Sequence, residues 1–158
     1  MKTCINLSKF FIFFFLIIGS KTIAQVSKHE VPSGTLKAIT ESNKLYFEAF
    51  EKNDSTLFIS RYTEDCWIMA PDVPTFCGVD APIGFYQIAY GQLGIRYGKK
   101  TTTSLLGTTN NMVAETGVFE FLDVNKKLIA KGNYLVLWKK TATGWRMFRD
   151  SFNGDKEN

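Results

Sequence analysis

The sequence predicts an α+β domain in which helices come first and an antiparallel sheet follows. In the first half of the chain, apolar residues recur at three- or four-residue steps, and from Ile95 onward they alternate with a period of two. Near the C-terminus, the alternating runs 131–139 and 145–153 flank the Gly-containing turn 141–144, which is typical of a β-hairpin. Helices followed by consecutive antiparallel strands define the α+β class.

The first helix is predicted over 36–52, after a cap at Ser33 or Thr35. Its buried stripe consists of residues at three- or four-residue spacing: Leu36, Ile39, Asn43, Phe47 and Phe50. Asp54 is then expected to cap a second, shorter helix that includes Tyr62.

One strand, one more helix and four longer strands account for the rest of the domain. A strand over 66–70 is expected to stop at Pro71, and a helix over 81–90 is expected to end at Gly91 and Gly94. The four longer strands, joined by Gly-, Asn- and Lys-containing turns, are 95–106, 112–122, 127–139 and 145–152. Helices that cover one face of such a curved sheet can leave a cavity between helix and sheet.

The N-terminus has the composition of a cleaved signal peptide. Lys2 and Lys9 precede the apolar run 10–18, and small residues at 22–24 suit a cleavage site before Gln25. A membrane span needs about 20 apolar residues, so this shorter run predicts no stable membrane insertion after cleavage. We therefore expect an exported protein, either periplasmic or secreted. The expected divisions are signal peptide 1–24, flexible mature N-terminus 25–33, domain 34–154 and tail 155–158.

Loss of the signal peptide lowers the formal net charge from +4 to +1, because Lys2, Lys9 and Lys21 leave with it. The remaining basic residues are scattered among acidic ones, apart from three lysine pairs that we place at solvated strand ends and turns. These pairs are 99–100, 126–127 and 139–140. Nucleic-acid binding needs a concentrated basic stripe, so we expect no nucleic-acid partner.

Two cysteines, Cys66 and Cys77, remain after processing. Outside the cytoplasm they can form a disulfide, but the demanding geometry of that bond leaves free thiols as the alternative. The single histidine, His29, lies in the mature N-terminus, which argues against a Ser-His-Asp triad and most zinc sites. No glycine-rich phosphate loop or nucleophile elbow is present in the sequence, so we expect neither a metal nor a cofactor.

Two C-terminal segments carry a resemblance to a known superfamily. They are 132–140, Gly-x-Tyr-x-x-x-Trp-Lys-Lys, and 144–153, Gly-Trp-Arg-x-Phe-Arg-Asp-x-Phe-Asn. Both are similar to the SnoaL-like, DUF4440-type branch of the nuclear-transport-factor-2-like (NTF2-like) superfamily, and segment 78–85 agrees with it. The resemblance covers 36–153 and implies a cone-shaped fold with N-terminal helices packed on a curved antiparallel sheet. Isomerases, cyclases, dehydratases, assembly modules and ligand binders all share that fold.

Asp150 is the first candidate for a catalytic group. With the turn at 141–144, it should share a sheet face with Phe148 and Phe152 and lie opposite Leu135. Such apolar surroundings raise the pKa of a carboxyl group toward neutrality, which suits the general acid or base that ketosteroid-isomerase relatives imply. The alternative is a structural ion pair with Arg61, Arg146 or Arg149. Glu115, on a neighbouring strand, is the second candidate.

Several aromatic side chains can stack on a ligand or donate a hydrogen bond to it, although in a small domain aromatic residues also form the core. The ligand-binding candidates are Trp67, Tyr62, Tyr134, Tyr86, Phe148 and Asn153. Among the aromatic ones, Trp67 and Tyr134 are the first choices for a cavity.

Three functions remain open from the sequence. The leading one is an exported pocket protein that binds a small, largely apolar molecule, with or without turning it over. The second is a cofactor-free proton-transfer enzyme, isomerase- or dehydratase-like, with Asp150 as its base. The third is a dimeric interaction module with a vestigial pocket, and a homodimer is expected. Its outer apolar face would be the row Tyr134, Val136, Trp138 and Met147.

Overall fold

The structure is a computed structural model that describes residues 30–109 and 111–155. Its helices are α1 (Thr35–Glu51), α2 (Ser55–Ile59) and α3 (Ala81–Tyr86), and α3 continues as a π-helical turn, η1 (Gln87–Gln92). Its strands are β1 (Tyr62–Met69), β2 (Phe76–Cys77), β3 (Tyr97–Thr109), β4 (Met112–Leu122), β5 (Leu128–Thr141) and β6 (Gly144–Gly154). The predicted signal peptide lies outside the described residues. Within them, no helix is long and apolar enough to cross a membrane.

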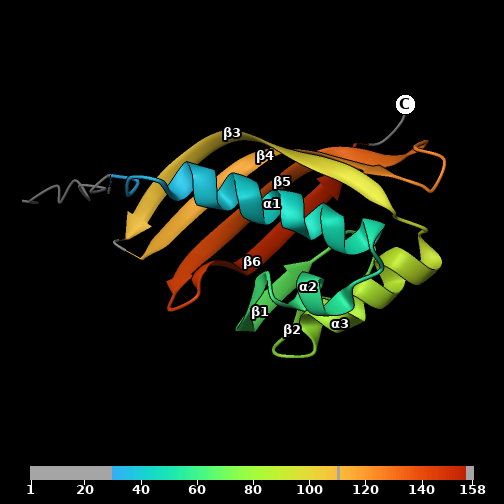
Figure 1. The fold of residues 1–158 in the computed structure, drawn as a ribbon, viewed down its shortest axis with the longest axis horizontal. Coiled ribbons are helices and arrows are strands. Elements are labelled where there is room, and N and C mark those ends of the chain that lie inside the picture. The colour runs from blue at the N-terminus through green and yellow to red at the C-terminus, as the bar shows by residue number, and fades with distance from the viewer. Residues whose placement is uncertain (1–29, 110, 156–158) are drawn as a thin grey trace, which may run out of the picture.

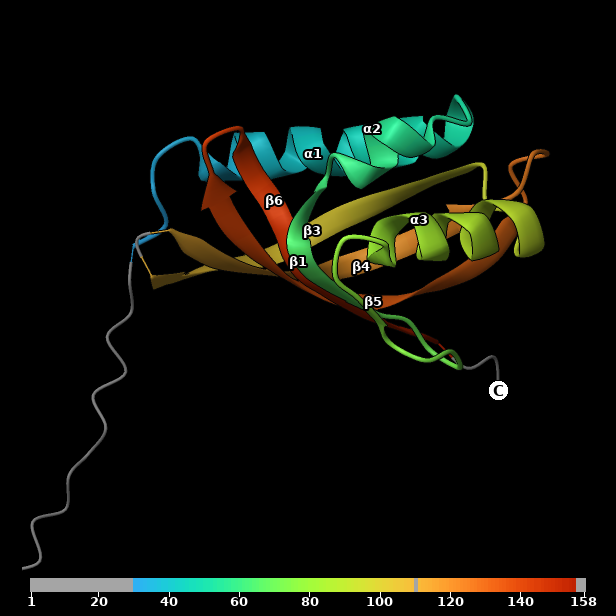
Figure 2. The same ribbon diagram turned by 90° about the horizontal axis from the view of Figure 1, so that it is seen from below.

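The strands form one six-stranded sheet in the order β2-β1-β6-β5-β4-β3. Neighbouring strands are antiparallel except β1 and β6, which run parallel. Figures 1 and 2 show the curved sheet with α1 running along it beside α2, and α3 close to β1 and β2. The predicted α+β architecture of helices packed on a curved antiparallel sheet is confirmed.

Aromatic rings from all three helices fill the space between the helices and the sheet. Phe58 of α2 lies at the centre, with its ring centroid 4.8 Å from that of Tyr46 and 5.2 Å from those of Phe50 and Tyr86. The ring of Phe85 stacks on that of Phe58 with the centroids 6.2 Å apart. Such edge-to-face and offset pairs stabilise a core beyond the area that they bury, and this cluster holds α1, α2 and α3 together.

The buried stripe of α1 and the end of the second helix differ from the prediction. Leu36, in the first turn of α1, is 53% exposed, whereas Tyr46, which the predicted stripe omits, is buried. Tyr62 is not in the second helix. That helix ends at Ile59, and the carbonyl of Arg61 already accepts a hydrogen bond from the backbone N–H of Met147 at 2.8 Å. Pairing with β6 therefore draws Tyr62 into β1.

The β5–β6 hairpin has the predicted turn but a different face assignment. Thr141 pairs with Gly144 as expected, yet Leu137 pairs with Arg149 while Trp138 pairs with Met147, so Phe148 is an extra residue on β6. A bulge of this kind shifts every later side chain to the opposite face.

The predicted grouping of Asp150 with Phe148, opposite Leu135, is therefore wrong. Asp150 pairs with Val136 and shares the helix-covered face with Tyr134, Trp138 and Met147, all of which are buried. That row therefore cannot be the outer apolar face proposed for a dimer. The outer face instead exposes Trp67, Leu106 and Leu135, by 44%, 47% and 48%.

The disulfide considered from the sequence is not formed, and both Cys66 and Cys77 are free. In the β1–β2 pair, Cys77 lies opposite Trp67, one position away from Cys66. Because side chains alternate between faces along a strand, Cys66 points into the core while Cys77 is exposed. Burial raises the pKa of the Cys66 thiol from 9.0 to about 11.

This difference predicts selective thiol chemistry in the folded full chain carrying Cys4→Ser. Below pH 9.0 the buried Cys66 thiol stays protonated, so Ellman's reagent should modify Cys77 about 100-fold faster. The raised pKa also has a stability consequence. Its contribution is complete below the unfolded pKa, so the free energy of unfolding should fall as pH rises from 9.0 to about 11.

The Cys66→Ala variant is the matched control, since it should lose that alkaline decline while keeping the fast phase at Cys77. Equal modification rates of the two thiols in the native protein would contradict the placement of Cys66 in the core.

Candidate functional site

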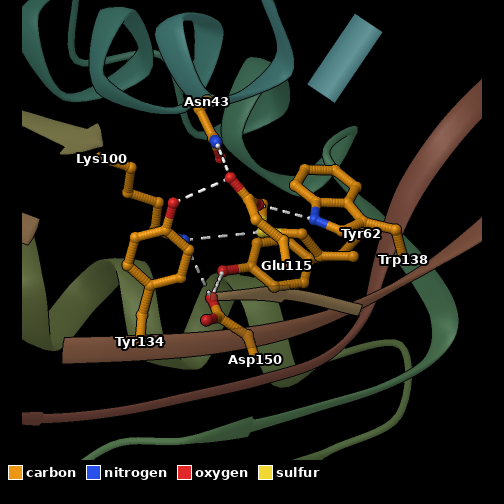
Figure 3. A network of polar contacts seen from close by, with 8 residues as sticks. Asn43, Tyr62, Lys100, Glu115, Tyr134, Trp138 and Asp150 are labelled. Atoms are coloured by element: carbon orange, nitrogen blue, oxygen red, sulfur yellow. Dashed lines mark hydrogen bonds and ion pairs between the residues drawn. The ribbon is translucent and has the colours of Figure 1, made fainter. Parts of the chain in front are cut away.

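Two buried carboxylates lie on the helix-covered face of the sheet. Glu115 of β4 is 0% exposed and Asp150 of β6 is 1% exposed. Val136 of β5 pairs with Glu115 on one side and with Asp150 on the other, so the two acids occupy one row across three strands. Two strand spacings put their Cα atoms roughly 10 Å apart. Figure 3 shows the polar cluster that surrounds them.

Glu115 accepts hydrogen bonds from four side chains. Its Oε1 accepts from Thr102 Oγ1 at 2.6 Å, Tyr134 O–H at 2.8 Å and Asn43 Nδ2 at 2.9 Å. Its Oε2 accepts from Trp138 Nε1 at 2.8 Å. Burial, and next the neighbouring Glu115, raises the pKa of Tyr134, which therefore remains a donor at neutral pH. A carboxylate with this many donors has little capacity left for a ligand.

Asp150 is less completely bonded. Its Oδ2 accepts from the Tyr62 hydroxyl at 2.8 Å and lies 3.7 Å from Lys100 Nζ. Its Oδ1 is buried and has no hydrogen-bond partner in the structure. Burial, followed by the charge of Asp150, holds the pKa of Tyr62 well above its usual value, so Tyr62 stays a donor. The ion-pair partner is thus Lys100 and not one of the three arginines considered from the sequence.

Lys100 of β3 places a buried ammonium group beside Asp150. Its side chain is only 3% exposed. Its Nζ lies 4.6 Å from the ring centroid of Tyr46, 5.1 Å from that of Tyr134 and 3.9 Å from Met147 Sδ. These are cation–π and weak sulfur contacts. Among the described residues, no side-chain oxygen hydrogen-bonds to Lys100 Nζ, which leaves three N–H donors without a strong acceptor.

A groove of about 530 Å³ between α1 and β3 borders this cluster. Asn43 and Lys100 line the groove and also belong to the cluster. Phe47 and Gly98 form an apolar part of its lining, and a Cβ at Gly98 would lie 2.4 Å from the Phe47 ring. Only glycine permits that approach of α1 to β3. Charged side chains of α1 and β3, Lys44, Glu48, Glu51, Lys52 and Lys99, also line the groove.

The structure brings four of the predicted site residues together: Asp150, Glu115, Tyr62 and Tyr134. Tyr86 instead belongs to the aromatic core. It stacks on Phe50 and donates to the carbonyl of Ala49 and to Asn53 Oδ1, each at 3.2 Å.

Three other predicted ligand contacts lie outside the cluster. Trp67 is on the outer sheet face, where the Arg149 guanidinium lies 4.7 Å from its ring centroid. Phe148 is the bulge residue and lies under the same guanidinium, at 3.6 Å. Asn153 is exposed near the end of β6. Strand alternation places Trp67 outward, and it does the same for Phe148, which directly follows the inward-facing Met147.

The sequence did not predict four residues of the cluster as site residues. They are Thr102, Trp138, Lys100 and Asn43, the last of which was expected only in the buried stripe of the first helix. Gly98, Lys100 and Thr102 alternate along β3, so a period of two could have placed Lys100 on the same face as Thr102. The neighbouring Lys99 has the predicted solvated position, with its side chain 63% exposed and its Nζ 3.3 Å from Glu120.

Solved structures with the same architecture identify the fold. One is a ketosteroid isomerase-like protein from Erwinia carotovora atroseptica. The match covers 80% of this chain and 100% of that protein, with 20% identity and a TM-score of 0.64. An NTF2-like superfamily protein from Salmonella enterica serovar Typhimurium matches 80% of this chain and 94% of its own, with 19% identity and a TM-score of 0.64. The chain has the NTF2-like fold.

An NTF-2 like protein of unknown function from Shewanella oneidensis is also similar, covering 74% of this chain and 97% of its own at 18% identity and a TM-score of 0.62. No protein-family model and no curated protein matches the chain. The SnoaL-like branch of the NTF2-like superfamily stays a prediction from the sequence. The fold itself hosts both pocket proteins and isomerase-like enzymes.

The four-donor environment predicts that Glu115→Gln destabilises the protein. A glutamine places an NH₂ group where a carboxylate oxygen accepted, so at least one buried donor loses its acceptor. We expect a loss of about 2–3 kcal/mol in the free energy of unfolding, measured by urea titration followed by circular dichroism.

Glu120→Gln is the matched control on the same strand. Its side chain is 41% exposed and forms a surface ion pair with Lys99, so the loss should stay below about 0.5 kcal/mol. Equal losses for the two variants would contradict the assigned role of Glu115.

Proposed function

We propose that this protein binds a small, largely apolar molecule that carries one neutral polar group, and that the α1–β3 groove is the binding site. The observation that carries this function is an unsatisfied buried pair, one member of which, the Lys100 ammonium group, belongs to a residue of the groove lining. Asp150 Oδ1 is a buried acceptor without a donor, and Lys100 Nζ is a buried donor without a strong acceptor. Buried polar groups in folded proteins are nearly always bonded, so a bound hydroxyl or carbonyl group would complete this pair.

The groove gives such a molecule a route to the cluster. Lys100 is one of the residues that line the groove, and its buried ammonium group lies 3.7 Å from Asp150 Oδ2, so the same residue belongs to the groove and to the cluster. Phe47 supplies an apolar contact for the body of the ligand. Pockets for small molecules combine apolar walls with a few convergent polar groups in this way.

The charge of the interior favours a neutral ligand. Glu115 and Asp150 together oppose a single ammonium, that of Lys100. A ligand with a carboxylate or phosphate group would add a further anion to a buried site that already holds two, which is costly. In this proposal the protein acts after export, with the predicted signal peptide removed, and the homodimer remains a prediction.

The binding site can be tested with 2-naphthol, a compact aromatic alcohol, titrated into the ¹⁵N-labelled full chain. We expect saturable shifts at the backbone amides of Asn43, Phe47, Gly98 and Lys100. Asp150→Asn should weaken binding about tenfold, because a neutral amide oxygen is a weaker acceptor for the hydroxyl proton than a carboxylate oxygen.

Leu135→Ala is the control for that titration, because Leu135 lies on the outer sheet face and the change should leave the affinity unaltered. Shifts confined to the outer face, or no saturable shifts at all, would rule out the groove as the site.

A cofactor-free proton-transfer enzyme is the second candidate, and one observation favours it. Asp150 has one oxygen fixed by the Tyr62 hydroxyl and the other free, which is the arrangement a general base requires. One solved structure of similar fold is described as ketosteroid isomerase-like, which agrees with this chemistry.

Proton abstraction next to a carbonyl can be followed with 2-tetralone in D₂O, by the loss of its α-proton signals. If Asp150 is the base, the full chain should accelerate exchange over buffer, and Asp150→Asn should lower the protein-catalysed rate by about 100-fold.

Asp65→Asn removes an exposed acid that contacts Lys139 at 3.3 Å and should leave exchange unchanged. Exchange in the full chain at the rate of buffer alone would leave simple binding as the function.

A further inference from the structure

Lys100 has surroundings unlike those of the other lysines whose ion pairs the structure describes. The side chains of Lys52, Lys99 and Lys139 are 61%, 63% and 40% exposed, and each of them contacts a carboxylate within 3.3 Å. Lys100 is 3% exposed, and its nearest carboxylate oxygen is 3.7 Å away. It is nevertheless part of the lining of an open groove. A small molecule that moves from the groove into the cluster would therefore meet a largely desolvated amine.

We propose that Lys100 is a reactive amine that forms an imine with an aldehyde bound in the α1–β3 groove. This inference rests on the proposed function, because it takes the same groove as the binding site and assigns the polar group of the ligand to the aldehyde class. A lysine in a desolvated pocket is a recognised nucleophile toward carbonyl carbons.

The chemistry requires a proton acceptor beside the ammonium, and Asp150 is in that position. The Lys100 ammonium first transfers one proton to Asp150, which leaves a neutral amine and a carboxylic acid. The amine nitrogen then attacks the aldehyde carbon, and a proton moves from that nitrogen to the former carbonyl oxygen to give a carbinolamine. Loss of the hydroxyl as water, assisted by the proton held on Asp150, leaves a C=N bond. One water is released for each aldehyde consumed, and no oxidant or reductant is needed.

The surrounding groups fit these steps. The rings of Tyr46 and Tyr134 flank Lys100 Nζ and exclude water from it, which favours the dehydrated product. Tyr62 bonds to Asp150 Oδ2 and leaves Oδ1 without a partner, so the carboxyl group can hold the transferred proton. Asn43 Oδ1 is a second buried acceptor without a partner, on the α1 side of the cluster.

The inference is tested by trapping the imine in the full chain. The protein is incubated with 2-naphthaldehyde at neutral pH, reduced with sodium cyanoborohydride, and digested for mapping of the modified lysines by mass spectrometry. We expect Lys100 to be modified about tenfold faster than Lys99, its exposed neighbour on β3 and the internal control. An excess of 2-naphthol should protect Lys100 and leave Lys99 unprotected.

Two variants distinguish the role of Lys100 as the nucleophile from that of Asp150 as the proton acceptor. Lys100→Arg should abolish the fast adduct, and Asp150→Asn should slow it by about 100-fold while the slow adducts at exposed lysines persist. Circular dichroism confirms that each variant is folded, and wild-type mapping decides the question even where a variant does not fold.

If Lys99 is labelled and Lys100 is not, as their solvent exposures alone would predict, the proposal that Lys100 forms an imine is overturned. If 2-naphthol still binds the groove in that case, the proposed binding function stands and only the covalent step fails. If neither 2-naphthol nor the aldehyde reaches Lys100, both fail together.

Discussion

The interior depends on one buried carboxylate, Glu115, and the four donors that surround it. Those donors come from three elements, because Asn43 lies on α1, Thr102 on β3, and Tyr134 and Trp138 on β5. Burying a charged group is costly unless its hydrogen bonds are complete. Correct placement of Glu115 therefore requires α1 to pack at one height on the sheet and β3, β4 and β5 to keep one register. This requirement links the position of the first helix to the geometry of the sheet.

A single extra residue decides where the second carboxylate points. Without the bulge at Phe148, strand alternation would place Asp150 on the outer face, on the side of Trp67 and Arg149. With it, Asp150 enters the interior in the same row as Glu115, where Tyr62 and Lys100 meet it. The parallel pairing of β1 with β6 brings Tyr62 to that point, and the alternation of β3 brings Lys100. The cluster is therefore a product of sheet register and not of any local motif.

This dependence on register explains what the sequence could predict. Strand β4 has the predicted bounds and the turn at 141–144 is correct, because alternation and turn residues are local signals. Asp150, Glu115 and Tyr134 were recognised as polar or aromatic residues on predicted strands, whereas Tyr62 was recognised as a candidate but was expected in the second helix. Lys100 was missed because a lysine in a pair at a strand end usually faces solvent, and Trp67 was misplaced because a large aromatic residue usually faces the core. The bulge at Phe148 carries no glycine or other mark in the sequence that would announce it.

The two carboxylates differ in the number of hydrogen bonds that each receives, and this difference divides their roles. Glu115 is fully bonded, so a change in its bonding would disturb the elements that supply its donors. Asp150 keeps one oxygen free, and the Nζ of Lys100, a residue of the groove lining, lies 3.7 Å from its other oxygen without a hydrogen bond. A ligand can therefore alter the surroundings of Asp150 by moving Lys100 alone, without breaking any hydrogen bond to Glu115. The fold thus places a fully bonded acid and a less completely bonded acid–lysine pair on either side of Val136. The groove meets the first through Asn43, whose amide is bonded to Glu115, and the second through Lys100.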